Sequence, residues 1–285
     1  MTAARARQSP TPAPTRPRQI VRRTQGTRHG PATRLMSPSD LGQLLKPFVF
    51  LDFFDMDTAS FPGIGLHPHS GIATVTYLFE GSVRYEDTSG ATGVLRAGGV
   101  EWFRAGGGAW HGGGPGDNGR SRGFQLWLAL PPEQELAPAE TVYLAPDAVA
   151  RDGPARVLVG THGTATSSLK APASLNYLAV RLRAGEFWRY QPGGNHTVGW
   201  VALSAGRIRV PELVEAGELA IFESSTEAID LHADVDTEFV LGSAPPHAYD
   251  LVLGQYSVHT SPATLRAGER RLSEIQHRLH NEGRL

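Results

Sequence analysis

The sequence predicts an all-β chain that contains two jelly-roll β-barrels, a C-terminal helix and a disordered N-terminal arm. Short runs of β-branched and aromatic residues recur along it, separated by turns that draw on 33 glycines and 21 prolines among 285 residues. The strand pattern occurs twice, which indicates two copies of one antiparallel unit. A hydrophobic fraction of 40% provides for real cores and excludes a largely disordered chain.

Two features that the sequence lacks exclude whole classes of protein. Cysteine is absent, which excludes disulfides, thiolate metal ligands and cysteine nucleophiles. No run approaches the ~18 consecutive apolar residues that a transmembrane helix needs. We expect a cytoplasmic monomer without a membrane partner.

The predicted arm, residues 1–30, is basic. Residues 1–34 hold eight arginines and neither lysine nor acid, so the net charge of −1 leaves −9 for the remainder (−1 less 8). Prolines disfavour an amphipathic targeting helix, and the apolar stretch of a secretory signal is missing. We expect a solvated, disordered tail. The alternative is a weak, non-specific contact with nucleic acid.

The first strand-rich unit covers residues 31–140 and the second covers residues 155–285, with a Pro- and Ala-rich connection between them. Each unit contains a strand, a glycine turn, a strand, an Ala-Gly turn and a further strand. The offset between the units is 125 residues at the glycine turn and 119 at the Ala-Gly turn. The intervening hairpin is therefore six residues shorter in the second unit.

The last segment, residues 263–285, is predicted to be helical. Leu272, Ile275 and Leu279 recur at i, i+3 and i+7, which places them on one face of a helix. We expect this face to lie along a barrel, while the arginines of the segment remain solvated.

The most chemically specific segment is the His-x-His pair of His67 and His69. Side chains alternate along an extended strand, so both imidazoles project to the same side. A third histidine, His111, follows after two hairpins, and an antiparallel barrel can return it beside the first two. Neutral imidazoles on one face suit a first-row divalent metal. Ordinary core or surface histidines are the alternative.

Nine segments around these histidines carry a family resemblance. They are Pro47–Asp52, His67–Gly71, Thr74–Leu78, Glu80–Gly81, Gly98–Trp102, Ala105–Gly106, Gln125–Trp127, Phe239–Gly242 and Pro245–Pro246. Together with His111, they closely resemble the pirin family of the cupin superfamily. The resemblance extends over about residues 30–280.

The resemblance implies a bicupin, in which two β-barrels pack face to face and the N-terminal barrel holds one metal ion, usually iron. It places the metal ligands at His67, His69 and His111. Fe2+ is therefore the expected cofactor, with another divalent first-row metal as the alternative. Some relatives oxidise flavonols such as quercetin, and others act as iron-dependent cofactors of transcription factors.

The sequence departs from the family pattern at the carboxylates. The family's fourth ligand is a glutamate two residues after the third histidine, where this chain has Gly113, and Ala73 occupies a second carboxylate position. We expect such a site to bind Fe2+ less tightly, to favour an anionic ligand and to be more open. The missing glutamate is also the base proposed for flavonol cleavage. No catalytic residue is assigned, because Glu101 and Glu80 are expected in strand-surface or turn roles.

The second unit does not repeat the histidine pattern. The offsets of 125 and 119 residues carry the three histidine positions onto Pro192, Gly194 and Asp230. We therefore expect no second metal site, and assign the second barrel to packing. Trp110 is expected to point away from the pocket of its neighbour His111, because adjacent strand residues face opposite ways.

Two functions remain open on the sequence alone. The first is a metal-dependent dioxygenase of the quercetin 2,3-dioxygenase type, which acts on a small aromatic or enolic molecule at the three-histidine site. The second is a non-enzymatic redox-sensing or transcription-cofactor-type regulator, with or without metal. No Ser-His-Asp order or nucleophile elbow is recognised.

Overall fold

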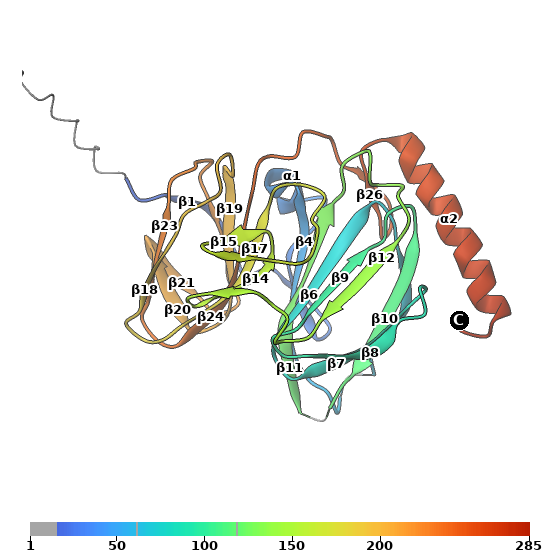
Figure 1. Cartoon of the computed structure of the whole chain (residues 1–285), viewed down its shortest axis with the longest axis horizontal. Coiled ribbons are helices and arrows are strands. Elements are labelled where there is room, and N and C mark those ends of the chain that lie inside the picture. Colours follow the sequence, from blue (N-terminus) through green and yellow to red (C-terminus); the bar gives the residue numbers. More distant parts are fainter. Residues whose placement is uncertain (1–15, 61, 118) are drawn as a thin grey trace, which may run out of the picture.

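In the computed structural model, which describes residues 16–60, 62–117 and 119–285, the chain forms two β-barrels that lie side by side (Figure 1). Each barrel consists of a seven-stranded and a four-stranded sheet of antiparallel pairs. The predicted all-β fold with two barrels is confirmed, and the predicted C-terminal helix is α2 (Pro262–Asn281). None of the described helices is long and apolar enough to cross a membrane.

The first barrel contains the histidine pair. Its seven-stranded sheet has the order β12 (Glu140–Leu144), β9 (Val100–Arg104), β6 (Ile72–Glu80), β11 (Arg120–Ala129), β4 (Phe48–Asp57), β3 (Ala32–Met36) and β2 (Thr27–His29). Its four-stranded sheet has the order β5 (Ile64–His69), β10 (Ala109–Pro115), β7 (Ser82–Asp87) and β8 (Thr92–Arg96). The short helix α1 (Leu41–Leu45) precedes β4.

The second barrel repeats this architecture. Its seven-stranded sheet has the order β1 (Ile20–Thr24), β22 (Leu219–Phe222), β19 (Val198–Ala205), β24 (Thr237–Ala244), β17 (Asn176–Leu182), β14 (Ala155–Val159) and β13 (Arg151–Asp152). Its four-stranded sheet has the order β18 (Phe187–Tyr190), β23 (Ile229–Ala233), β20 (Arg207–Val210) and β21 (Glu212–Glu215). Two small hairpins pair β15 (Thr161–His162) with β16 (Ala165–Thr166), and β25 (Val252–Leu253) with β26 (Val258–His259).

The two seven-stranded sheets pack against each other and form the central core. Phe48, Tyr77 and Trp102 of the first barrel belong to the same buried cluster as Tyr177 and Trp200 of the second. The rings of Phe48 and Trp200 meet edge to face, with centroids 5.3 Å apart. Large aromatic side chains contribute much of the burial energy at such an interface, so this layer holds the barrels together.

The interiors of the two barrels differ in polarity. Apolar side chains, including those of Trp188 and Phe239, form the cluster of the second barrel. Among the described residues, the first barrel buries two histidines, His69 and His111, beside Thr76, whereas the second buries one histidine, His196. Polar groups are retained in an interior when they have partners or a ligand to bind. The candidate site is therefore expected in the first barrel.

The N-terminal segment differs from the disordered arm expected over residues 1–30. Residues 1–15 lie outside the described residues, but the rest of the arm contributes β1 and β2. β1 pairs with β22 and completes the edge of the second barrel's sheet. Arg23 forms an ion pair with Glu218 at 2.7 Å. Backbone pairing with β22 and the ion pair with Glu218 hold this segment on the second barrel. The number of arginines does not reveal either contact.

The C-terminal segment packs on the first barrel, although it follows the second in sequence (Figure 1). On α2, Leu272, Ile275 and Leu279 are buried against Trp110 of β10. The predicted apolar face therefore lies along a barrel as expected, and Trp110 points outward from the barrel interior.

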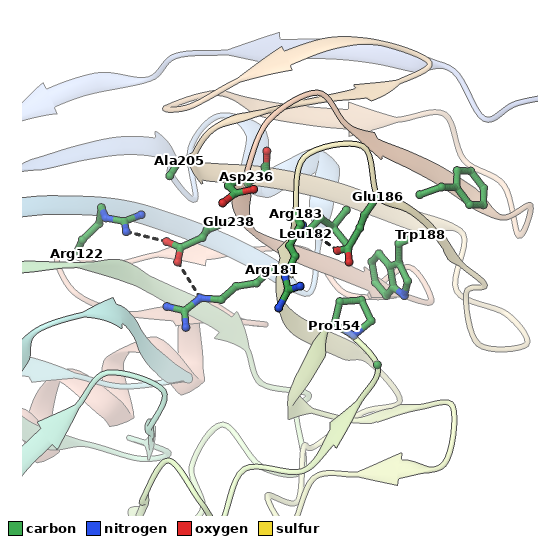
Figure 2. Close-up of a pocket in the computed structure, with 13 residues that line it drawn as sticks. Arg122, Pro154, Arg181, Leu182, Arg183, Glu186, Trp188, Ala205, Asp236 and Glu238 are labelled. Atoms are coloured by element: carbon green, nitrogen blue, oxygen red, sulfur yellow. Dashed lines mark hydrogen bonds and ion pairs between the residues drawn. The ribbon is translucent and has the colours of Figure 1, made fainter.

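A hollow of about 810 Å³ lies at the junction of the two barrels (Figure 2). Glu238 on β24 forms ion pairs with Arg122 on β11 at 2.7 Å and with Arg181 on β17 at 2.8 Å. Arg181 also donates to the carbonyl oxygen of Phe79 at 2.7 Å. The charges are paired with one another across the junction, so we assign this hollow to packing between the barrels.

Replacing Gly71 with Ala is expected to destabilise the protein by ~2–5 kcal/mol. Gly71 has a φ of +72°, and a Cβ there would lie 2.0 Å from the carbonyl oxygen of Val258. Left-handed backbone strain contributes ~1–2 kcal/mol and displacement of packed backbone ~1–3 kcal/mol. Gly90 is the matched control, because it has a φ of +89° with no atom within 4 Å of such a Cβ. Urea unfolding should show a loss of only ~1–2 kcal/mol for Gly90→Ala, and equal losses in the two variants would contradict the clash.

Candidate metal centre

Strand pairing brings the three predicted ligand histidines together. His67 and His69 are two residues apart on β5, so their side chains share one face of the strand. β10 runs antiparallel to β5 and places His111 directly opposite His67. The centroid of the His111 ring lies 4.6 Å from that of His67 and 5.0 Å from that of His69. The prediction that two hairpins return His111 to the side of His67 and His69 is therefore met by the structure.

The donor atoms of these rings are arranged as a metal site requires. One ring nitrogen of each histidine lies within 4.8 Å of those of the other two. Nε2 of His69 and Nε2 of His111 are buried and have no hydrogen-bond partner among the described residues. Leaving a buried polar atom unpaired costs ~1–3 kcal/mol. A divalent metal ion at this point would satisfy these atoms, so the donor set fits the metal that the family resemblance implies.

The other nitrogen of each ring is held by an acceptor. Nδ1 of His67 donates to the carbonyl oxygen of Gly65 at 3.0 Å, and Nδ1 of His69 donates to that of Tyr256 at 3.0 Å. Nδ1 of His111 donates to Oε1 of Glu101 at 3.2 Å. Such partners fix the tautomer that leaves Nε2 as the ligand atom and orient the ring.

Burial keeps the histidine pair neutral. Loss of water around the ring, with a smaller contribution from His111, lowers the pKa of His67 to about 4. Complete burial, again with the neighbouring histidines, holds the pKa of His69 well below its ordinary value. A neutral imidazole is the form that binds a metal ion, so both rings are in the ligand form at neutral pH.

Glu101 is part of the site, contrary to the strand-surface role expected from the sequence. Its side chain is buried, and its Oε1 contacts Nδ1 of His111. Burial alone would raise the pKa of Glu101, but hydrogen bonds from His111 and Thr76 outweigh it and hold the pKa below its ordinary value. On β9, Trp102 points into the central core, so its neighbour Glu101 faces the barrel interior. Strand alternation relative to Trp102 was the signal that could have revealed it.

A second carboxylate lies behind Glu101. The hydroxyl of Tyr143 is 3.3 Å from Oδ2 of Asp87 and 3.5 Å from Oε1 of Glu101. Asp87 is fully buried and is paired with His111 across β7 and β10. The first barrel therefore holds two buried acidic groups beside the imidazoles, which the sequence analysis did not identify.

The C-terminal segment supports the site from outside the barrel. The carbonyl oxygen of Tyr256 holds His69, and Ser257 forms a bridge to Ser70, which follows that ligand. The hydroxyl of Ser70 donates to that of Ser257 at 2.8 Å. A backbone carbonyl has no sequence signature, so this contact was not predictable.

A Ser-His-Glu arrangement, which the sequence analysis did not recognise, anchors the same segment. Oγ of Ser70 is 2.9 Å from Nε2 of His259, and Nδ1 of His259 is 3.3 Å from Oε2 of Glu135. Glu135 also accepts hydrogen bonds from the backbone and hydroxyl of Thr260 at 2.7 and 2.8 Å. Ser70, His259 and Glu135 are at most 1% exposed. Since a substrate has no access to the hydroxyl, the arrangement has a structural role.

A cavity of about 130 Å³ opens beside the histidines. His67, His111, Glu101 and Gly113 line it, together with the apolar side chains of Pro31, Ala32, Phe54, Met56, Ile64 and Val83. His69 is fully buried behind this surface. The cavity can therefore bring a small molecule to the face where the imidazoles meet.

The second barrel offers no comparable group among the described residues. His196 lies near the mapped ligand positions, but Ser174 and Ser243 bind both of its nitrogens at 3.0 and 2.9 Å. His232 is exposed and lies 3.7 Å from Asp234. A buried apolar cluster fills much of its interior, and the packing role assigned to this barrel stays a prediction.

Comparison with known proteins identifies the family. Residues 30–128 match the protein-family model described as Pirin. A pirin-like protein of Caulobacter vibrioides is 33% identical over 245 residues, which cover 82% of this chain and 88% of that protein. The chain belongs to the pirin family.

Solved structures extend the pirin fold over both barrels. A quercetin 2,3-dioxygenase of Acinetobacter baumannii aligns with a TM-score of 0.82 at 23% identity, covering 90% of this chain and 96% of that one. The bacterial pirin YhhW of Escherichia coli, in complex with nickel(II), aligns with a TM-score of 0.60 at 23% identity, covering 81% of this chain and 98% of that one. This pirin-family chain thus combines three juxtaposed histidines with glycine at position 113 and a buried carboxylate behind His111.

Proposed function

We propose that the chain is a metal-dependent dioxygenase that holds Fe2+ through His67, His69 and His111 and acts on a small aromatic or enolic substrate. The observation that carries the proposal is the pair of buried, unpartnered Nε2 atoms of His69 and His111 beside a cavity. The name of the Acinetobacter structure supports oxygen chemistry, and the nickel(II) complex of YhhW supports a divalent ion. Imidazole ligands suit several first-row metals.

The residues around the site have two roles: some bind the metal ion, and others limit the access of water to the cavity. When bound, a redox-active divalent ion supplies Lewis acidity toward an enol oxygen and the electron transfer that oxygen chemistry needs. The three neutral imidazoles hold that ion without contributing charge, which favours an anionic, deprotonated substrate beside it. Phe54 and Met56 contribute apolar surface to the cavity, which Asp52, Arg84 and Gln125 line as well, and this apolar part limits the access of water.

The cavity volume predicts a preference for single-ring enols over three-ring flavonols. Drug-sized ligands occupy cavities of ~300–1,000 Å³, whereas this one measures about 130 Å³. We expect kcat/KM for a 3-hydroxypyran-4-one, the enolic ring of a flavonol without its aryl groups, to exceed that for quercetin by roughly 10- to 100-fold. Oxygen uptake by the iron-loaded protein measures both values. Equal values would contradict the size argument.

The control for this experiment is His67→Ala, supplied with the same total iron. Oxygen uptake that needs His67 supports the proposed enzyme, and uptake that persists in the variant contradicts it. Metal analysis of the purified protein accompanies the assay. Absence of bound metal from the wild-type protein would remove the proposed function altogether.

A non-enzymatic regulator is the second candidate, and Gly113 is the observation that favours it. Glycine leaves position 113 without the carboxylate that could accept a substrate proton, and Glu101, which also lines the cavity, is held by His111. A protein that binds iron stoichiometrically and consumes no oxygen with either substrate would support the regulator. Its partner, which we propose to be a transcription factor or nucleic acid, would then have to be sought directly.

A further inference from the structure

We propose that Glu101 is a positioning residue that supplies the negative charge of the metal centre through Nδ1 of His111, so that no carboxylate is needed at position 113. The inference rests on the metal-binding half of the proposed function. It assigns a role to a residue that does not touch the cluster of ligand atoms itself.

The first step is the geometry of the contact between Glu101 and His111. Oε1 of Glu101 lies 3.2 Å from Nδ1 of His111, and the two side chains are only 8% and 4% exposed. The His111 ring also stacks on Phe103, with centroids 4.2 Å apart and planes 7° from parallel. Carboxylate and aromatic ring together fix which nitrogen faces the histidine cluster. A carboxylate behind a ligating histidine raises the basicity of that ligand.

The second step concerns the charge inside the barrel. Glu101 and Asp87 are both buried, at 6% and 0% exposure, and both lie within hydrogen-bonding distance of the Tyr143 hydroxyl. A phenol has one proton and donates it to one carboxylate at a time. Hydrogen bonds from Ser89 and Tyr143 partly satisfy Asp87, and a nearby cation would offset the repulsion that remains between the two buried carboxylates. A divalent ion bound by the neutral imidazoles would supply that compensation a few ångströms away.

The third step concerns the open side of the site. Gly113 follows His111 by two residues on β10 and lines the same cavity. A Cβ at Gly113 would meet a single atom within 4 Å, the carbonyl oxygen of Arg84 at 2.9 Å. That backbone contact is closer than a Cβ normally makes, so a side chain here requires a small shift of β7 and would then add to the cavity lining. With Glu101 bound to Nδ1 of His111, the charge is retained without a carboxylate at position 113.

The experiment compares Glu101→Gln with the wild-type protein in its metal-free form. The variant keeps the shape of the side chain and removes its charge. Competition of each protein with a chromogenic chelator for Ni2+ gives the dissociation constant, and we expect the variant to bind Ni2+ ~10–100-fold more weakly. The visible absorption of the Co2+ form is expected to shift, because the electronic character of the His111 ligand changes. Glu80→Gln, on the barrel surface, is the matched control and should alter neither readout.

Two double variants distinguish the effect of the negative charge from the effect of the hydrogen bond between Glu101 and His111. Adding Gly113→Glu to Glu101→Gln restores a carboxylate to the site and should recover most of the affinity for Ni2+, whereas adding Gly113→Gln should not. Wild-type affinity in Glu101→Gln would overturn the proposal, and so would equal behaviour of the two double variants. If Glu101→Gln does not fold, Glu101→Asp decides, because it keeps the charge. A 10-fold loss of affinity in Glu101→Asp would overturn the proposal. A wild-type protein that binds no Ni2+ would instead refute the proposed function.

Discussion

Replacing His69 with Ala is expected to abolish stoichiometric metal binding. His69 is fully buried, its Nε2 is unpartnered, and its Nδ1 is fixed by the carbonyl oxygen of Tyr256. Removing a residue that only supports a ligand typically weakens metal binding ~10–100-fold, and loss of a ligand atom should exceed that range. Two imidazoles remain in the variant, His67 and His111, too few to hold a first-row ion against competing chelators. Metal content after dialysis against a chelator measures the effect.

The control is His196→Ala in the second barrel. His196 is also a buried histidine, 3% exposed, and its nitrogens bind two serine hydroxyls. This variant should lose stability through its broken hydrogen bonds while keeping the metal content of the wild type. If His69→Ala retains its metal, or if both variants lose it equally, the three-histidine centre is not where the metal binds.

The metal-free protein is expected to lose ~3 kcal/mol of stability through His67 alone as the pH falls from about 6.5 to about 4. Burial lowers the pKa of His67 to about 4 in the folded state, whereas an unfolded histidine has a pKa of ~6.5. Between these values the unfolded chain binds the proton and the folded chain does not, so acid favours unfolding. Above pH 6.5 both states are neutral and the contribution is fully retained. Each pKa unit corresponds to ~1.36 kcal/mol.

Urea unfolding between pH 7 and pH 4, with a chelator present, tests this linkage. The variant His67→Gln has the same carboxylates but lacks the titrating ring, so its stability should fall by ~3 kcal/mol less than that of the wild type. His232→Gln, which changes an exposed histidine, should follow the wild-type curve. Parallel curves for His67→Gln and the wild type would show that His67 is not buried as a neutral ring.

The fold was largely predictable because its signals are local. Alternating apolar residues, glycine turns and an internal repeat at similar offsets describe antiparallel barrels without any long-range information. The three histidines were also predictable, since His67 and His69 share a strand face and two hairpins return the chain to His111. What the repeat could not show is that Trp188 and Phe239 belong to an apolar cluster that fills the second barrel.

The support around the histidines was less predictable, for two physical reasons. Glu101 was assigned to a strand surface because the face of β9 can be decided only once Trp102 is known to lie between the barrels. The contact of Tyr256 with His69 joins residues 187 positions apart through a backbone carbonyl, which any residue type provides. The prediction of a disordered arm was wrong for β1. A strand adds to a sheet only where the sheet has a free edge, and the arginine content of the arm gives no information about that edge.

The C-terminal segment packs on the first barrel, so the metal site of this barrel is complete only late in synthesis. His69 emerges from the ribosome 187 residues ahead of Tyr256, a delay of roughly 10–40 s at ~5–20 residues per second. Over that interval the second half is made while the nascent site lacks the backbone acceptor that orients its deepest imidazole. Newly made chains should therefore bind their ion less tightly until Tyr256 is in place, and a protein truncated before residue 250 should bind it ~10–100-fold more weakly even if its first half folds.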